Sequence, residues 1–383
     1  MTRRITLEQI KRTNRHIIYE YIYSRKGEQV SQQDISRALK MSRPTVSGNL
    51  SAMEKDGLIY RSGLLEAGQP GRKSVTWSIT SDYRIALGIE ILKHTVTIIV
   101  IDLYGHALKC AKFLTEYSNS PEYYERISGK VKEFISSLGI GDPETRILGI
   151  GIAIQGLVSE DGGTVIYGEI LKCTGLKIDV FADRLNYPCK FVHEPDSAAL
   201  SELWVSPELK SAIYLSMSEH LGGALIADRR ILSGIHRHSS TFEHITASSG
   251  GELCYCGKRG CYETVCSKVA LLRDDEPDEF FRLVRSDEAE ASGRWLEFLK
   301  YLGRLIADLH LVADTKYILG GHLAPYFTEE DIDILYGHVR EHTPFAEGRD
   351  FILQSKMPSH NITIGAALPY IMRFLENVPD VKL

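Results

Sequence analysis

The stretch "HITASSGGELCYCGKRGCYETVCS", residues 244–267, contains four of the seven cysteines of this 383-residue chain. Three of them follow the spacing C-x-C-x4-C, and a histidine lies ten residues before the first. Three thiolates and an imidazole suit tetrahedral zinc, and a site whose four positions are all filled by protein is structural rather than catalytic. Two glycines inside the motif let the backbone fold tightly around an ion. The stretch therefore predicts a structural zinc ion held by His244, Cys254, Cys256 and Cys261.

Two alternatives to this ligand set remain open from the residues alone. The cysteines could be free thiols in a loop, although thiols at this density are prone to oxidation. Cys266 could also compete as a ligand. It falls in a predicted helical stretch, 266–273, so we expect it to be a buried thiol instead.

The composition is that of an ordinary soluble protein, with 43% hydrophobic and 25% charged residues. No apolar run approaches the roughly 20 residues that span a bilayer. The N-terminal segment "MTRRITLEQIKRTNRH" lacks the apolar core of a signal peptide. We therefore expect a cytoplasmic protein with reduced thiols and no membrane partner, which favours metal binding over disulfides.

Charge is distributed unevenly along the chain. Residues 1–80 contain 14 Lys and Arg against 7 Asp and Glu, a net charge of +7. The remaining residues contain 31 against 43, a net charge of −12. A basic head on an acidic body is typical of a protein whose head meets a polyanion, although a solvated helical face has the same composition.

The basic head has the pattern of a winged helix-turn-helix. Apolar residues recur at helical spacing, which predicts helices over 7–25, 32–40 and from 43 to near 55. Ser31 and Ser42 are suited to cap the second and third helices. Apolar and polar residues then alternate on both sides of the Gly/Pro-rich tip "GQPGRK", residues 68–73, which predicts a β-hairpin wing. We expect this domain to span residues 1–80.

The third helix and the wing tip supply side chains that suit a DNA interface. Small hydroxyl, amide and basic groups on an exposed recognition helix hydrogen-bond base edges or phosphates, and a cationic tip suits the minor groove. A three-helix unit can also be a protein-interaction module. The expected partner is double-stranded operator DNA, with contacts from Ser42, Arg43, Thr45, Ser47, Asn49, Gln69, Arg72 and Lys73.

From about residue 84 the pattern becomes α/β. Strand–turn–strand openings near residues 86 and 212 resemble each other, which predicts two similar lobes with a cleft between them. We expect the body to span 81–383. Its first lobe would contain residues 84–195 plus a C-terminal helix over 361–383, and its second residues 196–360, with the zinc loop at 244–263.

The cysteine-rich stretch resembles the signature of the ROK family of repressors, open reading frames and sugar kinases. The family form C-x-C-G-x-x-G-C-x-E is matched at every fixed position from Cys254 to Glu263. The resemblance implies an actin-like, hexokinase-like fold of two α/β lobes. Together with the winged head, it is similar to the repressor branch, typified by xylose and N-acetylglucosamine repressors.

The family's phosphate-binding motifs are altered here. ROK kinases carry D-x-G-G-T in their first strand pair, whereas this chain has "EILKH" from Glu90 to His94. The second motif is also changed, because Ser218, Glu219 and His220 stand where kinases have a G-T-G run. Glycines bring backbone amides close to phosphate, and Glu219 would repel a triphosphate. We expect no ATP cofactor and no enzymatic activity, with a residual sugar kinase as a weaker alternative.

The family's sugar contacts are kept in part. The resemblance assigns sugar-binding roles to Asp196, His244 and Glu263, whereas Thr241 and Glu243 replace a family Glu and Gly. The expected effector is a sugar or a sugar derivative, with Glu243 or Glu194 as substitute acceptors. A non-sugar ligand or a protein partner remains an alternative. The predicted protein represses carbohydrate-metabolism genes. We expect it to be a homodimer or tetramer, since paired half-sites multiply specificity.

Overall fold

A computed structural model describes residues 6–65, 74–345, 348–357 and 359–378 of the chain. The N-terminal unit contains three helices and a small antiparallel sheet with the strand order β1-β3-β2. The helices are α1 (Leu7–Tyr23), α2 (Gln32–Ala38) and α3 (Arg43–Lys55), and the strands are β1 (Val30–Ser31), β2 (Ile59–Leu65) and β3 (Ser74–Ile79). The wing tip, residues 66–73, lies outside the described residues.

Side-chain caps fix where these helices begin. Ser31 accepts a hydrogen bond from the backbone of Asp34, whose carboxylate in turn accepts one from Ser31, so the pair forms a capping box. Ser42 accepts from the backbone N–H of Thr45, and a proline follows in the first turn of α3. Both predicted caps are confirmed. The inward face of α3 is Val46, Leu50 and Met53, all of them buried.

The first sheet of the body has the order β10-β7-β4-β5-β6. Its strands are β4 (Ile85–Ile91), β5 (Thr95–Ile101), β6 (Ala107–Leu114), β7 (Ile147–Ile154) and β10 (Cys189–His193). An antiparallel meander, β4 to β6, continues into parallel strands β7 and β10. One face packs on α4 (Pro121–Ser136) and α6 (Asp179–Leu185) around a core that includes Ile89, Ile152 and Phe181. The short elements nearby are α5 (Pro143–Arg146), β8 (Leu157–Val158) and β9 (Val165–Tyr167).

The second sheet repeats this topology with the order β13-β12-β11-β14-β15. Its strands are β11 (Ala212–Met217), β12 (Leu221–Ala227), β13 (Arg230–Leu232), β14 (Lys316–Gly320) and β15 (Ile352–Gln354). Three helices build its largest core around Trp295: α10 (Pro277–Arg285), α11 (Ala289–His310) and α12 (Glu329–His342). The short elements are η1 (Phe242–His244), α8 (Glu263–Cys266), α9 (Lys268–Leu272), η2 (Ala324–Tyr326) and η3 (Arg349–Phe351). The two-lobed α/β fold is confirmed.

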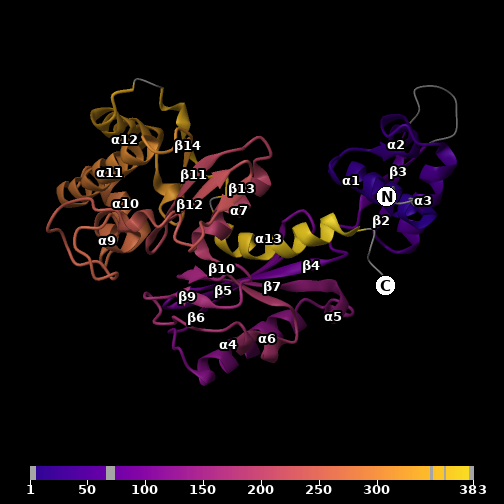
Figure 1. Cartoon of the computed structure of the whole chain (residues 1–383), viewed down its shortest axis with the longest axis horizontal. Helices are drawn as coiled ribbons and strands as arrows, with labels where there is room; N and C mark the ends of the chain where they lie inside the picture. The colour runs from indigo at the N-terminus through magenta and orange to yellow at the C-terminus, as the bar shows by residue number, and fades with distance from the viewer. Residues whose placement is uncertain (1–5, 66–73, 346–347, 358, 379–383) are drawn as a thin grey trace.

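Two helices lie between the sheets, α7 (Glu194–Val205) and α13 (Asn361–Glu376) (Figure 1). They pack closely, because a Cβ at Gly365 of α13 would lie 1.8 Å from the backbone oxygen of Ser197 in α7. Gly88 and Gly151 let α13 approach the first sheet in the same way. The sequence predicted a helix over 196–204, but α7 begins two residues earlier, at Glu194.

Candidate functional site: a metal centre beside an acidic pocket

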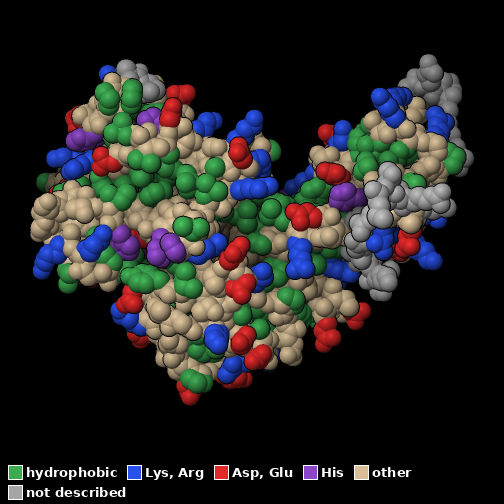
Figure 2. All heavy atoms as spheres, in the orientation of Figure 1, with side chains coloured by type: hydrophobic (Ala, Val, Ile, Leu, Met, Phe, Trp, Pro, Cys, Tyr) green, Lys and Arg blue, Asp and Glu red, His purple; other side chains and the backbone are tan. Residues whose placement is uncertain are grey.

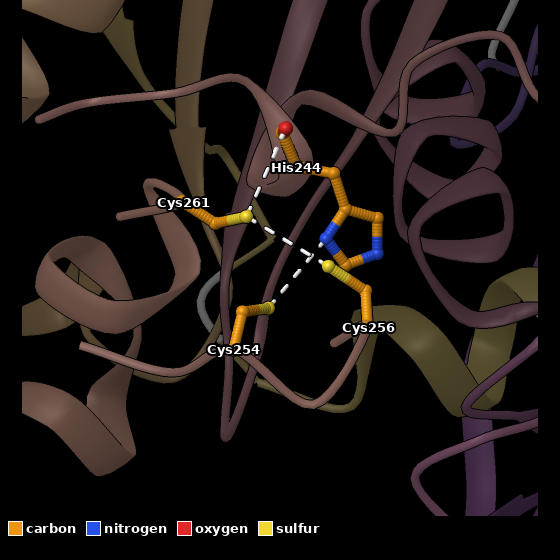
Figure 3. A group of neighbouring side chains, drawn as sticks. All are labelled: His244, Cys254, Cys256 and Cys261. Atoms are coloured by element: carbon orange, nitrogen blue, oxygen red, sulfur yellow. Dashed lines mark hydrogen bonds between the residues drawn. The ribbon is translucent and has the colours of Figure 1, made fainter. Parts of the chain in front are cut away.

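The predicted zinc ligands converge on one point (Figure 3). The donor atoms of His244, Cys254, Cys256 and Cys261 all lie within 4.8 Å of one another. The Cys254 Sγ is 3.7 Å from the His244 Nδ1, and the Sγ atoms of Cys256 and Cys261 are 3.8 Å apart. A tetrahedron with metal–sulfur distances of about 2.3 Å has edges of about 3.8 Å, so these spacings fit a zinc-sized ion.

Glycines with left-handed backbones set the shape of the metal loop, residues 244–263. Gly257 has φ +85° and Gly260 has φ +75°, and a Cβ at Gly260 would lie 1.8 Å from the Ser248 carbonyl oxygen. The backbone N–H of Cys254 donates to the Lys258 carbonyl at 2.8 Å. These contacts hold the ligands in place from within one short segment.

The thiols of this loop differ in their pKa values: burial raises the pKa of Cys261, whereas at Cys256 the effect of burial is outweighed by hydrogen bonds, which lower the pKa. Burial raises the pKa of Cys254 to about 12, so a cation is needed to make it a thiolate at neutral pH. The Cys256–Cys261 sulfur distance is far longer than a disulfide bond. Cys266 is fully buried in α8 and stands outside the cluster, as the sequence predicted.

A cavity of about 250 Å³ lies beside the metal loop, with walls from both lobes. His244 belongs to both sites, because its Nδ1 faces the thiols and its ring lines the cavity. The polar and aromatic lining residues are Gln155, Tyr167, Glu169, His193, Glu194, Ser216, His220, His238, Thr241, Glu243, His244 and Tyr255.

The three predicted effector residues take different positions. His244 lines the cavity, whereas Asp196 and Glu263 are not among its lining residues. Asp196 points to His193, with its Oδ1 3.5 Å from Nδ1, and the start of α7 presents Glu194 and Pro195 to the cavity instead. The Glu263 carboxylate lies behind the wall. It accepts hydrogen bonds from the backbone N–H of Leu221 at 2.8 Å and pairs with the His220 Nδ1 at 2.6 Å.

Three glutamates and four histidines line this cavity. Glu194 is 5% exposed and Glu243 is 8% exposed. Burial raises the pKa of both carboxyls, that of Glu243 to about 7. Burial works against protonation of His220, yet its hydrogen bond to Glu263 raises the pKa of the imidazole. Among the described residues, neither Lys nor Arg lines the cavity.

Several buried polar atoms at the cavity have no protein partner among the described residues. They are both amide atoms of Gln155 and the Oε2 of Glu243. A buried polar group without a hydrogen bond costs roughly 1–3 kcal/mol, so the site is suited to a ligand with several hydrogen-bonding groups.

Where the family binds phosphate, this chain has a different surface. Glu90 lies inside β4, not in the turn, and among the described residues its one hydrogen bond is from the Thr363 hydroxyl, at 3.4 Å. Burial raises the pKa of Glu90 to about 8. The β4–β5 turn is Leu92–His94, with Lys93 and His94 exposed and no glycine. A close backbone cradle for phosphate needs glycine at such a turn.

The predicted DNA-contact residues on α3 divide into two groups. Arg43 and Ser47 are exposed, whereas Thr45 and Asn49 are half-buried. The Ser42 side chain caps the helix, and the Asn49 amide donates to the Thr45 carbonyl at 2.8 Å, so both are already engaged. Gln69, Arg72 and Lys73 lie outside the described residues. Lys and Arg side chains are visible over this unit in Figure 2.

Sequence reasoning missed most of the cavity. Gln155, His193, His220 and Tyr255 come from separate segments, and no local pattern marks them as neighbours. The one available signal was Tyr255, which lies between two predicted metal ligands and so had to lie at the metal loop.

Comparison with known families gives two matches. The ROK family model matches residues 86–341, and the MarR family model matches residues 11–67. The described residues include no helix that is long and apolar enough to cross a membrane.

Similar proteins include named repressors. A xylose repressor from Caldicellulosiruptor bescii is 23% identical over 385 residues, covering 93% of this chain and 94% of that protein. A xylose repressor from Bacillus subtilis is 24% identical and covers 70% of each chain. The DNA-binding transcriptional dual regulator NagC from Escherichia coli is 25% identical over 212 residues, covering 54% of this chain and 51% of that protein.

Solved structures share the fold. A ROK family transcriptional regulator, a homologue of the E. coli MLC protein, matches 97% of this chain and 98% of its own with a TM-score of 0.73 and 20% identity. A ROK family glucokinase from Streptomyces griseus, in complex with glucose and AMPPNP, matches 74% of this chain and 98% of its own with a TM-score of 0.65 and 20% identity. At this level of sequence identity, the two structures support the assignment of the fold and nothing further.

Proposed function

The chain belongs to the ROK family, and we propose that it is a DNA-binding transcriptional repressor of sugar-metabolism genes. Its N-terminal unit would bind operator DNA, and its cavity would bind a sugar-type effector. The observation that carries the proposal is a helix-turn-helix with an exposed Arg43 and Ser47, joined to a two-lobed ROK body. Similar proteins of nearly the same length are named xylose repressors.

DNA binding would follow the usual geometry of this motif. The start of α3 enters the major groove with Arg43 and Ser47, and the groove beside it is lined by Gln32, Gln33 and Arg61. One such unit makes a small interface. A homodimer or tetramer that reads two half-sites would supply the specificity that one unit lacks.

The metal centre would hold a structural zinc ion through His244, Cys254, Cys256 and Cys261. Such an ion adds rigidity and folding free energy when all its ligands come from protein. We place phosphoryl transfer outside the function of this chain, because the glycine-free β4–β5 turn and the acidic Glu219 disfavour a bound triphosphate.

Helix α7 offers a route from the cavity to the DNA-binding unit. It begins at the cavity with Glu194, and near its other end the Trp204 Nε1 donates to the Tyr104 carbonyl at 2.9 Å. The Tyr104 ring stacks on Tyr23 of α1 with centroids 4.7 Å apart, and the Tyr23 hydroxyl donates to the Leu103 carbonyl at 2.6 Å. Helix α1 and helix α7 therefore contact the same turn, at Leu103 and Tyr104.

A ligand can act through this route only if the protein has two conformations that differ in the position of α7. The ligand must bind these two conformations with different affinity. Trp204→Phe keeps the aromatic ring but loses the hydrogen bond to Tyr104. We expect this variant to bind operator DNA normally and to respond less to the effector. An unchanged response would remove this bond from the route.

Operator binding is the test of the proposed function. Fluorescence anisotropy with zinc-loaded protein and duplexes from its own upstream region should show tight binding that weakens with salt. Arg43→Ala should weaken specific binding by roughly 1–3 kcal/mol if Arg43 reads a base. Arg126→Ala, an exposed basic residue on α4, is the matched control. Absence of specific binding to any of these duplexes would contradict the repressor proposal.

A further inference from the structure

The cavity and the shell behind it carry more negative than positive groups. Glu194 faces the cavity, and Asp196 and Glu263 stand behind it, paired with His193 and His220. Four acidic side chains, those of Glu194, Glu243, Asp196 and Glu263, stand against the imidazoles of His193, His220 and His238, because His244 is a predicted zinc ligand. The remaining lining acid, Glu169, is already paired with the Lys172 Nζ at 2.7 Å. Among the described residues that line the cavity, only imidazoles could offer a counter-charge to an anionic ligand such as a sugar phosphate, and two of these are already paired with carboxylates.

Aromatic rings stand next to these acids. Tyr167 and Tyr255 line the cavity, and Tyr255 lies between two metal ligands of the loop. Its ring makes edge contacts with His220 at 5.4 Å and with His244 at 5.1 Å between centroids. The metal loop therefore fixes the position of this ring. Carboxylates combined with an aromatic face are the usual surroundings of a bound ammonium group.

The unpartnered atoms suit a ligand rich in donors. Gln155 is 4% exposed and offers both an acceptor and a donor, and the Glu243 Oε2 is a buried acceptor. Hydroxyl and ammonium groups would satisfy them. A cavity of about 250 Å³ has the size of one sugar ring rather than of an oligosaccharide.

We propose that this cavity binds an amino sugar, a single sugar ring with a free ammonium group. Glu194, Glu243 and Tyr255 would surround the ammonium, and Gln155 would bind ring hydroxyls. This inference rests on the proposed function, because it names the chemical class of the effector for the same cavity. It excludes sugar phosphates and N-acylated sugars as preferred ligands, since the first add negative charge and the second lose the positive charge.

Isothermal titration calorimetry of the full-length, zinc-loaded protein tests the ligand class without DNA. D-glucosamine, D-galactosamine and D-mannosamine would each be compared with the parent hexose, with the N-acetyl derivative and with the 6-phosphate. We expect at least one amino sugar to bind tenfold or more tightly than its three counterparts. Equal or tighter binding of a neutral sugar or a phosphate overturns the proposal, and so does failure of every amino sugar to bind.

A charge-neutral variant locates the recognition. Glu194→Gln keeps the side-chain shape and should reduce the preference for the amine over the parent hexose at least fivefold. Glu160→Gln, at an exposed acid outside this cavity, should leave the preference unchanged. An unchanged preference in Glu194→Gln, with its melting temperature intact, contradicts the role of Glu194. If Glu194→Gln does not fold, the wild-type ligand series still decides the proposal.

Operator binding, measured separately, distinguishes the two possible failures. Loss of the amino-sugar preference with operator binding intact refutes only the ligand class. Absence of operator binding refutes the repressor, whatever the cavity binds.

Discussion

The metal loop and the cavity wall beside it are built in opposite ways. All four metal ligands come from one segment of twenty residues, and its pattern is the complete family signature. The cavity wall is assembled from segments of both lobes, and its residues depart from the family pattern at Thr241 and Glu243. A site closed within one loop keeps its geometry through local glycines and backbone hydrogen bonds. A site assembled from distant strands can change its chemistry while the scaffold stays the same.

Removal of one metal ligand should have the largest effect, because it disturbs both regions. We expect Cys256→Ser to lose the bound metal and to lower the free energy of unfolding by on the order of 3 kcal/mol or more. Since Tyr255 lies between two ligands, binding at the cavity should fall as well. Metal analysis and thermal unfolding check this, with the exposed Cys110→Ser as the matched thiol control. Full metal content and an unchanged melting temperature would refute the metal assignment.

The buried Glu90 of β4 should make stability depend on pH. Burial raises the pKa of Glu90 from 4.5 to about 8, so the folded chain keeps a proton that the unfolded chain releases. The free energy of unfolding should therefore fall as pH rises from about 4.5 to about 8, by a few kcal/mol at most. Glu90→Gln should remove this slope, so its advantage over the wild type should grow up to pH 8 and then level off.

Urea unfolding at pH 5, 6.5 and 8 measures this difference. The exposed Glu160→Gln should follow the wild type at every pH. Parallel curves for Glu90→Gln and the wild type would mean that Glu90 is ionised in the folded protein and that water reaches its carboxylate.

The same contrast explains what could be predicted from the sequence. The helix caps Ser31 and Ser42 were predictable because each acts on residues three positions away. Asp196 was placed in the cavity from its position in the family motif, whereas in the structure its carboxylate lies beside His193 and does not line the cavity. Glu194 and Pro195, in the first turn of α7, line the cavity, and a sequence motif alone does not fix how a helix is rotated against its neighbours.

Other residues of the site could not be predicted for a different reason. Gln155 follows β7 and His220 lies between β11 and β12, so only the packing of the two lobes brings them together. The topological repeat was visible in the two similar strand openings, but the identity of the facing side chains was not. The wing-tip contacts Gln69, Arg72 and Lys73 stay predictions.

Removal of the hydrogen bond between His220 and Glu263 should have an intermediate effect on stability. It tests whether Glu263 stabilises the cavity wall. His220→Ala would leave the buried Glu263 carboxylate with the Leu221 N–H and without its imidazole. We expect a loss of about 1–3 kcal/mol in the free energy of unfolding, measured by urea unfolding at pH 7. The exposed His236→Ala is the matched control. Equal stability of the two variants would show that Glu263 finds another partner and that the wall is adaptable.

The smallest effect should come from Tyr255→Phe, and it sharpens the contrast at a residue that, like the ligand His244, belongs to both the metal loop and the cavity wall. The ring makes the edge contacts with His220 and His244, and phenylalanine keeps them. We expect a change in stability within about 0.5 kcal/mol and unchanged metal content. Amino-sugar affinity should stay within about threefold of the wild type, because a phenyl face also attracts an ammonium group. A large loss of affinity with metal content intact would mean that the Tyr255 hydroxyl, and not the ring face, recognises the ligand. The metal loop would then supply a polar contact to the cavity in addition to the aromatic ring.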